Sequence, residues 1–309
     1  MTGHKLSFHK INSKKKALIL GSAVIDVIVT IPALPKTGDD VFAGSQDVIV
    51  GGCAYNVGNI LKQLKASYDL MIPIGNGPNA MHIKKQIALD GHDQMLSDLN
   101  GDNGWCLCIV EENGERTFIT VPGIENDWQE DWFEQVNLRE YDYIYLSGYS
   151  FEGESAKVLL NQLQNKKEET DIIFDPSPRV SKMNKTHLNE LLELGTILHC
   201  NRDELLALSE QDDIKAAAKT MNRKTNKPVV VTLGSEGTLY VDNGTSKLCP
   251  GRNVPLVDTI GAGDTHTAAF IGALLNEQSI ETACIWGNDA AAKVVQVQGA
   301  NVKLFEDET

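Results

Sequence analysis

Short apolar runs rich in β-branched residues alternate with helix-like patterns along this 309-residue chain. The apolar runs lie at residues 16–30, 70–74, 143–146, 172–174, 197–199 and 229–232. Helical spacing of apolar residues lies between most of them, at residues 54–64, 80–89, 155–163, 188–194 and 214–221. Strands joined through helices pair in parallel, because a parallel connection needs a long crossover. The pattern therefore predicts an α/β fold built on a mostly parallel sheet.

Two regions interrupt this alternation. Residues 41–50 and 105–121 have strand-like composition without an intervening helix, and the second contains the turn signal Glu112, Asn113 and Gly114. Such a turn favours an antiparallel hairpin. We therefore expect a small β-sheet that projects from the main sheet and acts as a lid. Because no linker separates two halves, residues 1–309 are expected to form one domain.

The composition excludes several classes of protein. With 42% hydrophobic residues the chain can bury a full core. The net charge of −14 argues against binders of nucleic acid or of anionic membranes, which need clustered Lys and Arg. The six cysteines lack the density of a disulfide scaffold and the paired spacing of a zinc site. The scattered cysteines fit a reducing cytoplasm, so a cytoplasmic protein is expected. No run approaches the ~18 apolar residues of a membrane span.

The segment from Asp258 to Asp264 carries the strongest chemical signal. Gly261, Ala262 and Gly263 are small residues that precede Asp264 and an apolar helical stretch. Free backbone N–H groups at a helix start, together with the helix dipole, bind phosphate. The carboxylate of Asp264 is then a base directed at the group that receives the phosphate, so the segment indicates phosphoryl transfer.

A second candidate site combines Gly51, Gly52 and Asn56 with Asp26. A glycine pair between a strand and a helix lets a ligand approach closely, and Asn56 offers donors and an acceptor to a polyhydroxylated molecule. The alternative is a tight turn with an incidental Asn. Asp26 lies in a buried apolar run and needs a partner. That partner is either structural or a sugar hydroxyl.

Two further segments allow both a structural and a functional interpretation. Asn201 and Glu204 open a helix, either as a capping box or as ligands of a hydrated Mg²⁺ and nucleotide phosphates. The turn with Thr232, Gly234 and Gly237 is either a plain hairpin or a phosphate-binding turn. A weaker signal, G-x-G-x-x-A at residues 75–80, fits a dinucleotide fingerprint, but a proline intrudes and a second nucleotide-binding half is missing.

Together these motifs resemble the ribokinase or PfkB-type carbohydrate kinase family over residues 16–300. The family's C-terminal signature is matched at each position of residues 258–271. The N-terminal signature is recognisable at Gly51, Gly52, Asn56 and Gly58. The N-x-x-E element, the T-L-G-x-x-G turn at residues 232–237 and a late helix at residues 288–292 follow in the family's order.

The resemblance implies a three-layer α/β/α domain with a mostly parallel central sheet and a small β lid, whose strands occupy about residues 31–50 and 104–121. Asp264 would be the base, beside an anion hole of Gly261, Ala262 and Gly263. The sugar would be bound by Asp26, Gly51, Gly52 and Asn56. ATP and Mg²⁺ would meet Asn201, Glu204 (to Mg²⁺ through water), Thr232, Gly234, Gly237 and Asn288. Asp258 and the Ile260 carbonyl would form a monovalent-cation site of the ribokinase branch, and potassium would then activate the protein.

The expected reaction moves the γ-phosphoryl of ATP to a hydroxymethyl group of a neutral sugar, as in ribokinases and fructokinases, or of a nucleoside. A neutral acceptor is favoured because Arg116 is the only basic residue of 101–121 and Lys36 is outnumbered by lid aspartates. Stacking on Phe42, Tyr55 or Trp105 would instead indicate a nucleoside. Pseudouridine-type and sugar-acid kinases are alternatives, and a catalytically silent nucleotide or sugar sensor is an alternative of another class. Pairing of two chains through the lid is a further expectation.

Two positions depart from the family pattern. His266 stands where an apolar residue is common, either packed in the helix or acting on the acceptor or on Asp264. Residues 175–179, D-P-S-P-R, resemble the D-P-N-x-R of fructokinase-like and ketodeoxygluconate kinase-like members, but Ser177 replaces the Asn. The sequence therefore leaves the acceptor open.

Overall fold

The computed structural model describes residues 7–112, 115–300 and 302–305, so the predicted turn residues Asn113 and Gly114 lie outside it. Its large sheet has eight strands in the order β12-β11-β10-β9-β8-β7-β1-β4. Six of them pair in parallel: β1 (Ala17–Leu20), β4 (Tyr68–Met71), β7 (Tyr143–Ser147), β8 (Asp171–Asp175), β9 (Thr196–Asn201) and β10 (Val229–Thr232). An antiparallel hairpin of β11 (Gly237–Asp242) and β12 (Thr245–Pro250) completes one edge. The predicted parallel sheet is confirmed.

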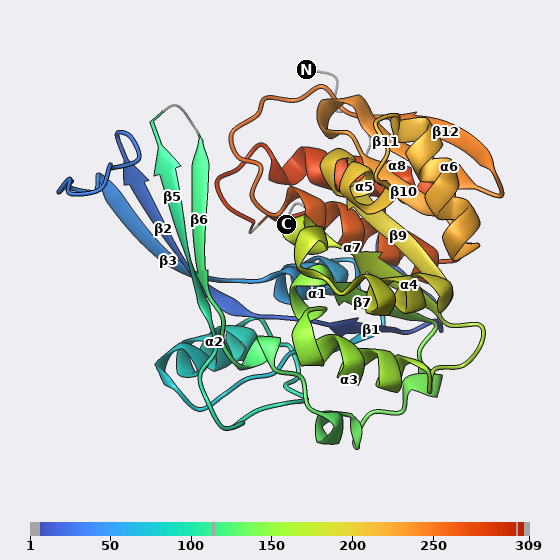
Figure 1. Ribbon diagram of the computed structural model, residues 1–309, viewed down its shortest axis with the longest axis horizontal. Coiled ribbons are helices and arrows are strands. Elements are labelled where there is room, and N and C mark those ends of the chain that lie inside the picture. Colours follow the sequence, from blue (N-terminus) through green and yellow to red (C-terminus); the bar gives the residue numbers. More distant parts are fainter. Residues whose placement is uncertain (1–6, 113–114, 301, 306–309) are drawn as a thin grey trace.

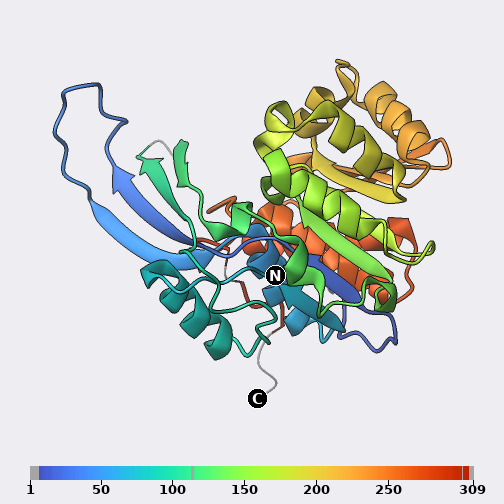
Figure 2. The same cartoon turned by 60° about the horizontal axis from the view of Figure 1, so that its bottom comes forward.

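Helices cover both faces of this sheet (Figures 1 and 2). One buried apolar cluster packs strand residues such as Ile19 against α1 (Cys53–Gln63), α2 (Pro78–Leu89), α7 (Ala262–Leu275) and α8 (Ile280–Val294). A second cluster packs the alternate residues, such as Leu18 and Leu20, against α3 (Gly153–Leu163), α4 (Lys185–Glu193), α5 (Arg202–Ser209) and α6 (Ile214–Thr225). Strand side chains alternate between the two faces, and the result is the expected three-layer α/β/α architecture.

A second sheet of four strands stands apart from the large one (Figure 1). Its order is β3-β2-β5-β6, with β2 (Val24–Ile31), β3 (Ser45–Gly51), β5 (Trp105–Glu111) and β6 (Arg116–Val121). The predicted 105–121 hairpin is confirmed, because β5 and β6 pair antiparallel. This small sheet is the lid.

The prediction of one buried strand over residues 16–30 was wrong. The chain leaves the large sheet after Leu20, and its continuation, β2, belongs to the lid. At the break, a Cβ on Gly21 would lie 2.9 Å from the Cβ of Ala54, so the chain crosses α1 at very close range. Asp26 therefore lies in the lid and not in the parallel sheet. Residues 41–44, predicted as strand, are irregular.

All six cysteines are free thiols, four of them buried, as their scattered spacing predicts. Within the described residues, no helix is both long enough and apolar enough to cross a membrane. The three layers place the carboxyl ends of β7, β8, β9 and β10 on one side of the molecule. The starts of α1 and α7 also lie there, because Cys53 and Asp264 are close to Ser147 and Asp175 at the ends of β7 and β8. Ligands of open α/β sheets bind outside this strand edge.

Candidate active site

The start of α7 forms an open anion-binding turn. Gly261, the residue before the helix, has a left-handed φ of +73°, and a Cβ there would lie 2.4 Å from the Cβ of Ala300. Only glycine fits such a position without strain. The first hydrogen bond of the helix runs from the Thr265 N–H to the Gly261 carbonyl and is 2.8 Å long. The amides of Gly263 and Asp264 come before Thr265 in the chain. They point out of the helix start as free donors, and a Cβ on Gly263 would meet nothing within 4 Å.

Asp264 and Asn56 meet at the starts of two helices. The Asn56 amide donates to Oδ2 of Asp264 over 2.8 Å. Burial raises the pKa of the Asp264 carboxyl, and hydrogen bonds from Asn56 and Cys53 oppose that rise. Gly52, just before α1, has φ +106°, and a Cβ on it would lie 2.6 Å from the Ser22 carbonyl oxygen. The glycine is therefore required for the turn that brings Asn56 to Asp264.

Asp26 joins this pair from the lid. Burial, and secondly the charge of Asp264, raise the pKa of Asp26 to about 7. A Cβ on Gly51 would lie 1.9 Å from Oδ2 of Asp26, so the missing side chain makes room for this carboxylate. The structure thus brings together the predicted acceptor residues Asp26, Gly51, Gly52 and Asn56 with the predicted base Asp264.

The capping interpretation of Asn201 and Glu204 is confirmed. The Asn201 side chain accepts from the Glu204 amide at 2.9 Å, and Oε2 of Glu204 accepts from the Asn201 amide at 2.8 Å. Burial raises the pKa of Glu204. Asp175, at the carboxyl end of β8, also has a pKa raised by burial and then by the charges of Glu204 and Asp264. Asp175 was not predicted as a site residue, although its position in the D-P-S-P-R run was the available signal.

These carboxylates fit a site for Mg²⁺. Mutually repelling carboxylates at a phosphate site are stabilised by a cation, and Mg²⁺ uses one or two carboxylates plus substrate phosphates and water. Within the residues that the structure describes, no group of three or more His, Cys, Asp or Glu side chains could hold a metal on its own. Asp175 and Glu204 would therefore hold a Mg²⁺ that also binds phosphate.

A groove of about 730 Å³ leads away from the anion-binding turn, within the range usual for ligand sites. Predicted residues in its lining are Ala262, Gly263, Asn201, Thr232, Gly234, Gly237 and Asn288. Apolar residues not predicted from the sequence form another part of its wall, namely Val254, Leu256, Ala291, Ala292 and Val295. No sequence signal marked Val254 and Leu256, because they lie in an irregular segment. A polar end beside the turn and an apolar wall suit a nucleotide.

Two predicted residues are occupied by structural hydrogen bonds. Asn288 donates to the carbonyls of Cys249 and Pro250 and accepts from the Thr238 hydroxyl at 2.7 Å. His266 is 3% exposed and bonds through its ring nitrogens to His199 and Thr238, each at 2.8 Å. Among the two interpretations of His266, packing in the helix is the one observed.

Both carboxylate oxygens of Asp258 also accept structural hydrogen bonds. Its Oδ1 accepts from the Ile260 amide at 2.8 Å and from Nη2 of Arg116 at 2.6 Å. Its Oδ2 accepts from the Gly299 amide at 2.9 Å. Ile260 thus contacts the carboxylate through its backbone amide.

The dinucleotide-like run at residues 75–80 has no room for a pyrophosphate. The carboxylate of Asp102 accepts from the amides of Asn79 and Ala80 at 3.2 and 2.8 Å, at the start of α2. A Cβ on Gly77 would lie 2.2 Å from the Asp102 carboxyl carbon. The glycines here accommodate a capping side chain of the protein itself.

Stacking of a base on Tyr55 or Trp105 is contradicted. The Tyr55 hydroxyl donates to Asp90 at 2.5 Å, at the far end of α2. Trp105 pairs with Ile25 across the lid, so it lies on the face opposite to Asp26. Phe42 is 94% exposed. Tyr149 has an aromatic ring near the site, and its pKa is raised by burial and by nearby groups that include Cys53 and Asp264.

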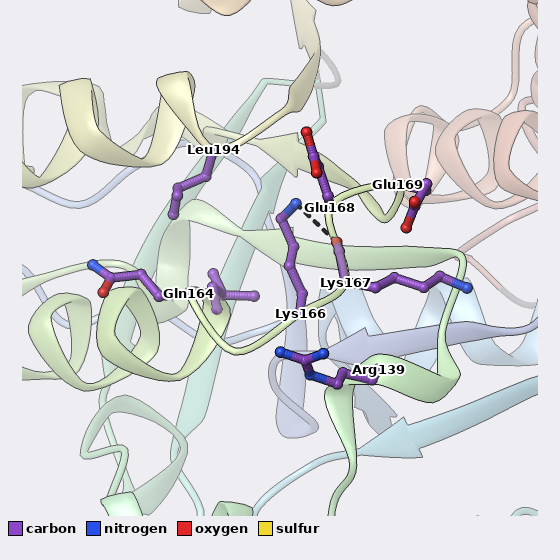
Figure 3. A pocket seen from close by; sticks show the side chains of 8 residues that line it. Arg139, Gln164, Lys166, Lys167, Glu168, Glu169 and Leu194 are labelled. Carbon is purple, nitrogen blue, oxygen red and sulfur yellow. Dashed lines mark hydrogen bonds between the residues drawn. The ribbon is translucent and has the colours of Figure 1, made fainter.

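A hollow lined by Arg139, Lys166, Lys167 and Glu169, shown in Figure 3, lies elsewhere. Its lining residues between 163 and 169 precede β8 and Arg139 precedes β7, so the hollow lies at the amino ends of the parallel strands. Its lysines are engaged locally, since Lys166 donates to the Thr170 carbonyl at 2.8 Å and Lys167 pairs with Asp142 at 3.0 Å. None of its lining residues lines the groove beside the anion-binding turn.

Comparison with known proteins agrees with this geometry. The family model of the pfkB family carbohydrate kinases matches residues 14–306. The chain is 31% identical to the uncharacterized sugar kinase YegV of Escherichia coli, covering 97% of this chain and 94% of that one. It is 26% identical to ribokinase of Haemophilus influenzae, covering 94% and 95% of the two chains.

Solved structures show the same fold. Ribokinase of Thermotoga maritima superposes with a TM-score of 0.82 at 24% identity, over 94% of this chain and 96% of the other. Arabidopsis thaliana ribokinase, solved with ribose and ATP, superposes with a TM-score of 0.76 at 26% identity, over 93% and 94%. The chain therefore belongs to the pfkB family of carbohydrate kinases, as a sugar or nucleoside kinase with the ribokinase fold.

Proposed function

We propose that this kinase transfers the γ-phosphoryl of ATP to a hydroxymethyl group of a neutral sugar or nucleoside, with residues 1–309 acting as one domain. The observation that carries the proposal is the position of Asp264. Its carboxylate lies beside the free amides of α7, is bonded to Asn56 at 2.8 Å and is close enough to Asp26 to raise its pKa. One group thus lies between a phosphate site and a hydroxyl-binding site. The six free thiols fit a reducing cytoplasm.

Asp264 would act as general base. An acceptor hydroxyl held by Asp26 and Asn56 loses its proton to Asp264 as it attacks the γ-phosphorus, and ADP leaves. The raised pKa of Asp264 makes it a stronger base than an exposed aspartate. The amides after Gly261 stabilise the charge on the transferred group. Such a transition state needs positioning and charge stabilisation rather than covalent help.

The nucleotide would lie in the 730 Å³ groove. Its phosphates would point toward Gly263, its base toward Val254, Leu256 and the Ala291 face of α8. Asp175 and Glu204 would hold Mg²⁺, Glu204 through water, because their burial without a cation is unfavourable. When bound, Mg²⁺ neutralises developing charge on the phosphates.

Charge pairing favours a neutral acceptor. A substrate phosphate or carboxylate needs an arginine or lysine with free donors. Near the site, Arg179 pairs with both carboxylate oxygens of Glu152, at 2.5 and 3.1 Å, and Arg116 pairs with Asp258. A carboxylate thus already balances the charge of each guanidinium, so we expect phosphosugars and sugar acids to be poor acceptors. Hydroxyls suit Asp26 and Asn56, and Tyr149 offers a ring to a sugar or base.

The test is coupled ADP release over a panel of sugars, sugar acids and nucleosides, with wild type and Asp264→Asn. We expect neutral acceptors to be turned over, and the variant to lose about 10² to 10⁴ in kcat. ATP binding by Asp264→Asn, measured by calorimetry, should persist. Full turnover by the variant would contradict the assignment of the base. ATP binding by wild type without turnover of any acceptor would instead indicate a sensor.

The lid also offers a surface for a second copy of the chain. Val48, Val27, Leu107 and Ile119 form one row across its four strands. By strand alternation this row lies on the face opposite to Asp26. Val48 is 45% and Ile119 52% exposed. We include a homodimer through this row in the proposal, because exposed apolar rows of this kind mark interfaces.

A further inference from the structure

An ion pair joins the lid to the segment that builds the anion-binding turn. Nη2 of Arg116, the first residue of β6, lies 2.6 Å from Oδ1 of Asp258, and its Nη1 donates to Thr259 at 2.9 Å. The Asp258 side chain is 6% exposed and that of Arg116 20%. The two residues are 142 positions apart in the chain.

Asp258 holds the anion-binding turn in place from two sides. It accepts from the Ile260 amide at 2.8 Å and from the Gly299 amide at 2.9 Å. Gly299 precedes Ala300, which packs against Gly261. The carboxylate therefore fixes the loop immediately before the free amides of α7. A carboxylate this buried needs a positive partner or several hydrogen bonds, and Asp258 has both.

The residues present do not fit a monovalent cation at this carboxylate. The guanidinium of Arg116 already carries the single positive charge that a potassium ion would supply, and it contacts Oδ1 of Asp258 directly. Oδ2 is engaged by a backbone amide.

We propose that Arg116 replaces a monovalent cation in this kinase and positions the anion-binding turn through Asp258. The inference rests on the proposed phosphoryl transfer. Because Arg116 belongs to the lid, the counter-charge reaches Asp258 only while the lid lies over the site. Lid closure and ordering of the phosphate-binding turn become one event, so the turn is complete when the acceptor is covered and water is excluded.

The experiment compares wild type, Arg116→Ala and Arg116→Lys in chloride salts of potassium, sodium and tetramethylammonium at constant ionic strength. Wild-type kcat should be the same in all three salts within about twofold. The kcat of Arg116→Ala should fall about tenfold or more in tetramethylammonium and recover in potassium chloride. Arg116→Lys should lie between the two, because an ammonium reaches Asp258 without the fork that also binds Thr259.

A second readout needs no turnover. Potassium should raise the Tm of Arg116→Ala by roughly 2 °C or more and leave wild-type Tm unchanged. Adding Asp258→Asn to Arg116→Ala should abolish the response, since a neutral amide does not hold the ion. Arg139→Ala, an arginine at the opposite sheet edge, should behave as wild type in both assays.

Two results would overturn the proposal. One is a wild-type kinase that potassium activates severalfold or stabilises. The other is an Arg116→Ala variant that loses activity equally in every salt and gains no stability from potassium, which would assign Arg116 to the transferred phosphoryl. The Tm measurements test the role of Arg116 even if no acceptor is found. Failure of this proposal can therefore be distinguished from failure of the proposed kinase activity.

Discussion

His199 and His266 are hydrogen-bonded to each other in the core, with Nε2 of His199 2.8 Å from Nδ1 of His266. The direction of this bond follows from Asn288, whose amide donates to two carbonyls and whose oxygen accepts from Thr238. Thr238 has then used its one proton, so His266 Nε2–H donates to it and Nδ1 accepts from His199. Burial lowers the pKa of both rings and so favours the neutral form of each.

The ring of His266 leaves no room for a side chain at Gly287. A Cβ on Gly287 would lie 2.5 Å from Cε1 of His266, so Gly287→Ala should lower the free energy of unfolding by about 1–3 kcal/mol. Urea unfolding measures it. Adding His266→Ala removes the clash, so the two losses should be less than additive. Gly263→Ala is the matched control, because a Cβ on Gly263 would meet nothing within 4 Å. Gly234→Ala is not suitable, because alanine is strained at the positive φ of Gly234. Strict additivity of Gly287→Ala and His266→Ala would contradict the packing.

The burial of His266 should also make the free energy of unfolding depend on pH. The pKa of His266 is lowered from 6.5 to about 4 by burial. Between these values the unfolded chain binds the proton and the folded chain does not, so stability is lost as the pH falls from 6.5 to 4. The contribution is about 3 kcal/mol.

Because other groups titrate in this window, the informative quantity is a difference. We expect the gap in unfolding free energy between wild type and His266→Gln to shrink steadily from pH 7 to pH 4, measured by urea unfolding at each pH. A gap that stays constant would show that folding does not lower the pKa of His266.

The lid surface gives a prediction about assembly. Wild type should sediment as a dimer, at twice the chain mass of 33.8 kDa, and Val48→Glu with Ile119→Glu should sediment as a monomer. Charges in an apolar interface leave buried ions unpaired. Leu248→Glu on β12, an equally exposed apolar position remote from the lid, should remain dimeric. A wild-type mass of one chain would remove the lid dimer from the proposal.

Local patterns predicted much of the fold and part of the site. Buried strands flanked by helices give continuous apolar runs, which marked the strands of the parallel sheet. The capping residues Asn201 and Glu204 are three positions apart, so their bond was one of two predicted interpretations. The anion-binding turn before Asp264 is equally local.

Features that depend on distant residues could not be predicted. Nothing within residues 16–30 states that the run changes sheets after Leu20, because the partners that define each sheet lie elsewhere in the chain. The carboxylate of Asp102 caps the start of α2 by accepting from the Ala80 amide, and the two residues are 22 positions apart. Arg116 and Asp258 are 142 positions apart, so the sequence offered Asp258 as a cation ligand without its guanidinium partner.

Asp26 should show a trade-off between stability and substrate binding. Its pKa is about 7 in the folded protein and 3.8 in an unstructured chain. The folded chain therefore holds the proton more tightly, and stability is lost as the pH rises from 4 to 7. At pH 8 the ionised carboxyl costs up to about 4 kcal/mol. Asp26→Asn should be more stable than wild type at pH 8, with the advantage vanishing near pH 4.

The same substitution should weaken acceptor binding. A carboxylate accepts hydrogen bonds from hydroxyls more strongly than an amide does, so the acceptor KM should rise by about 10- to 100-fold while the KM for ATP changes little. Asp47→Asn is the matched control, since Asp47 lies on the neighbouring lid strand and is exposed. It should alter neither quantity. An Asp26→Asn variant that is less stable at pH 8, or that keeps the wild-type acceptor KM, would show that this carboxylate has a structural partner instead of a sugar hydroxyl.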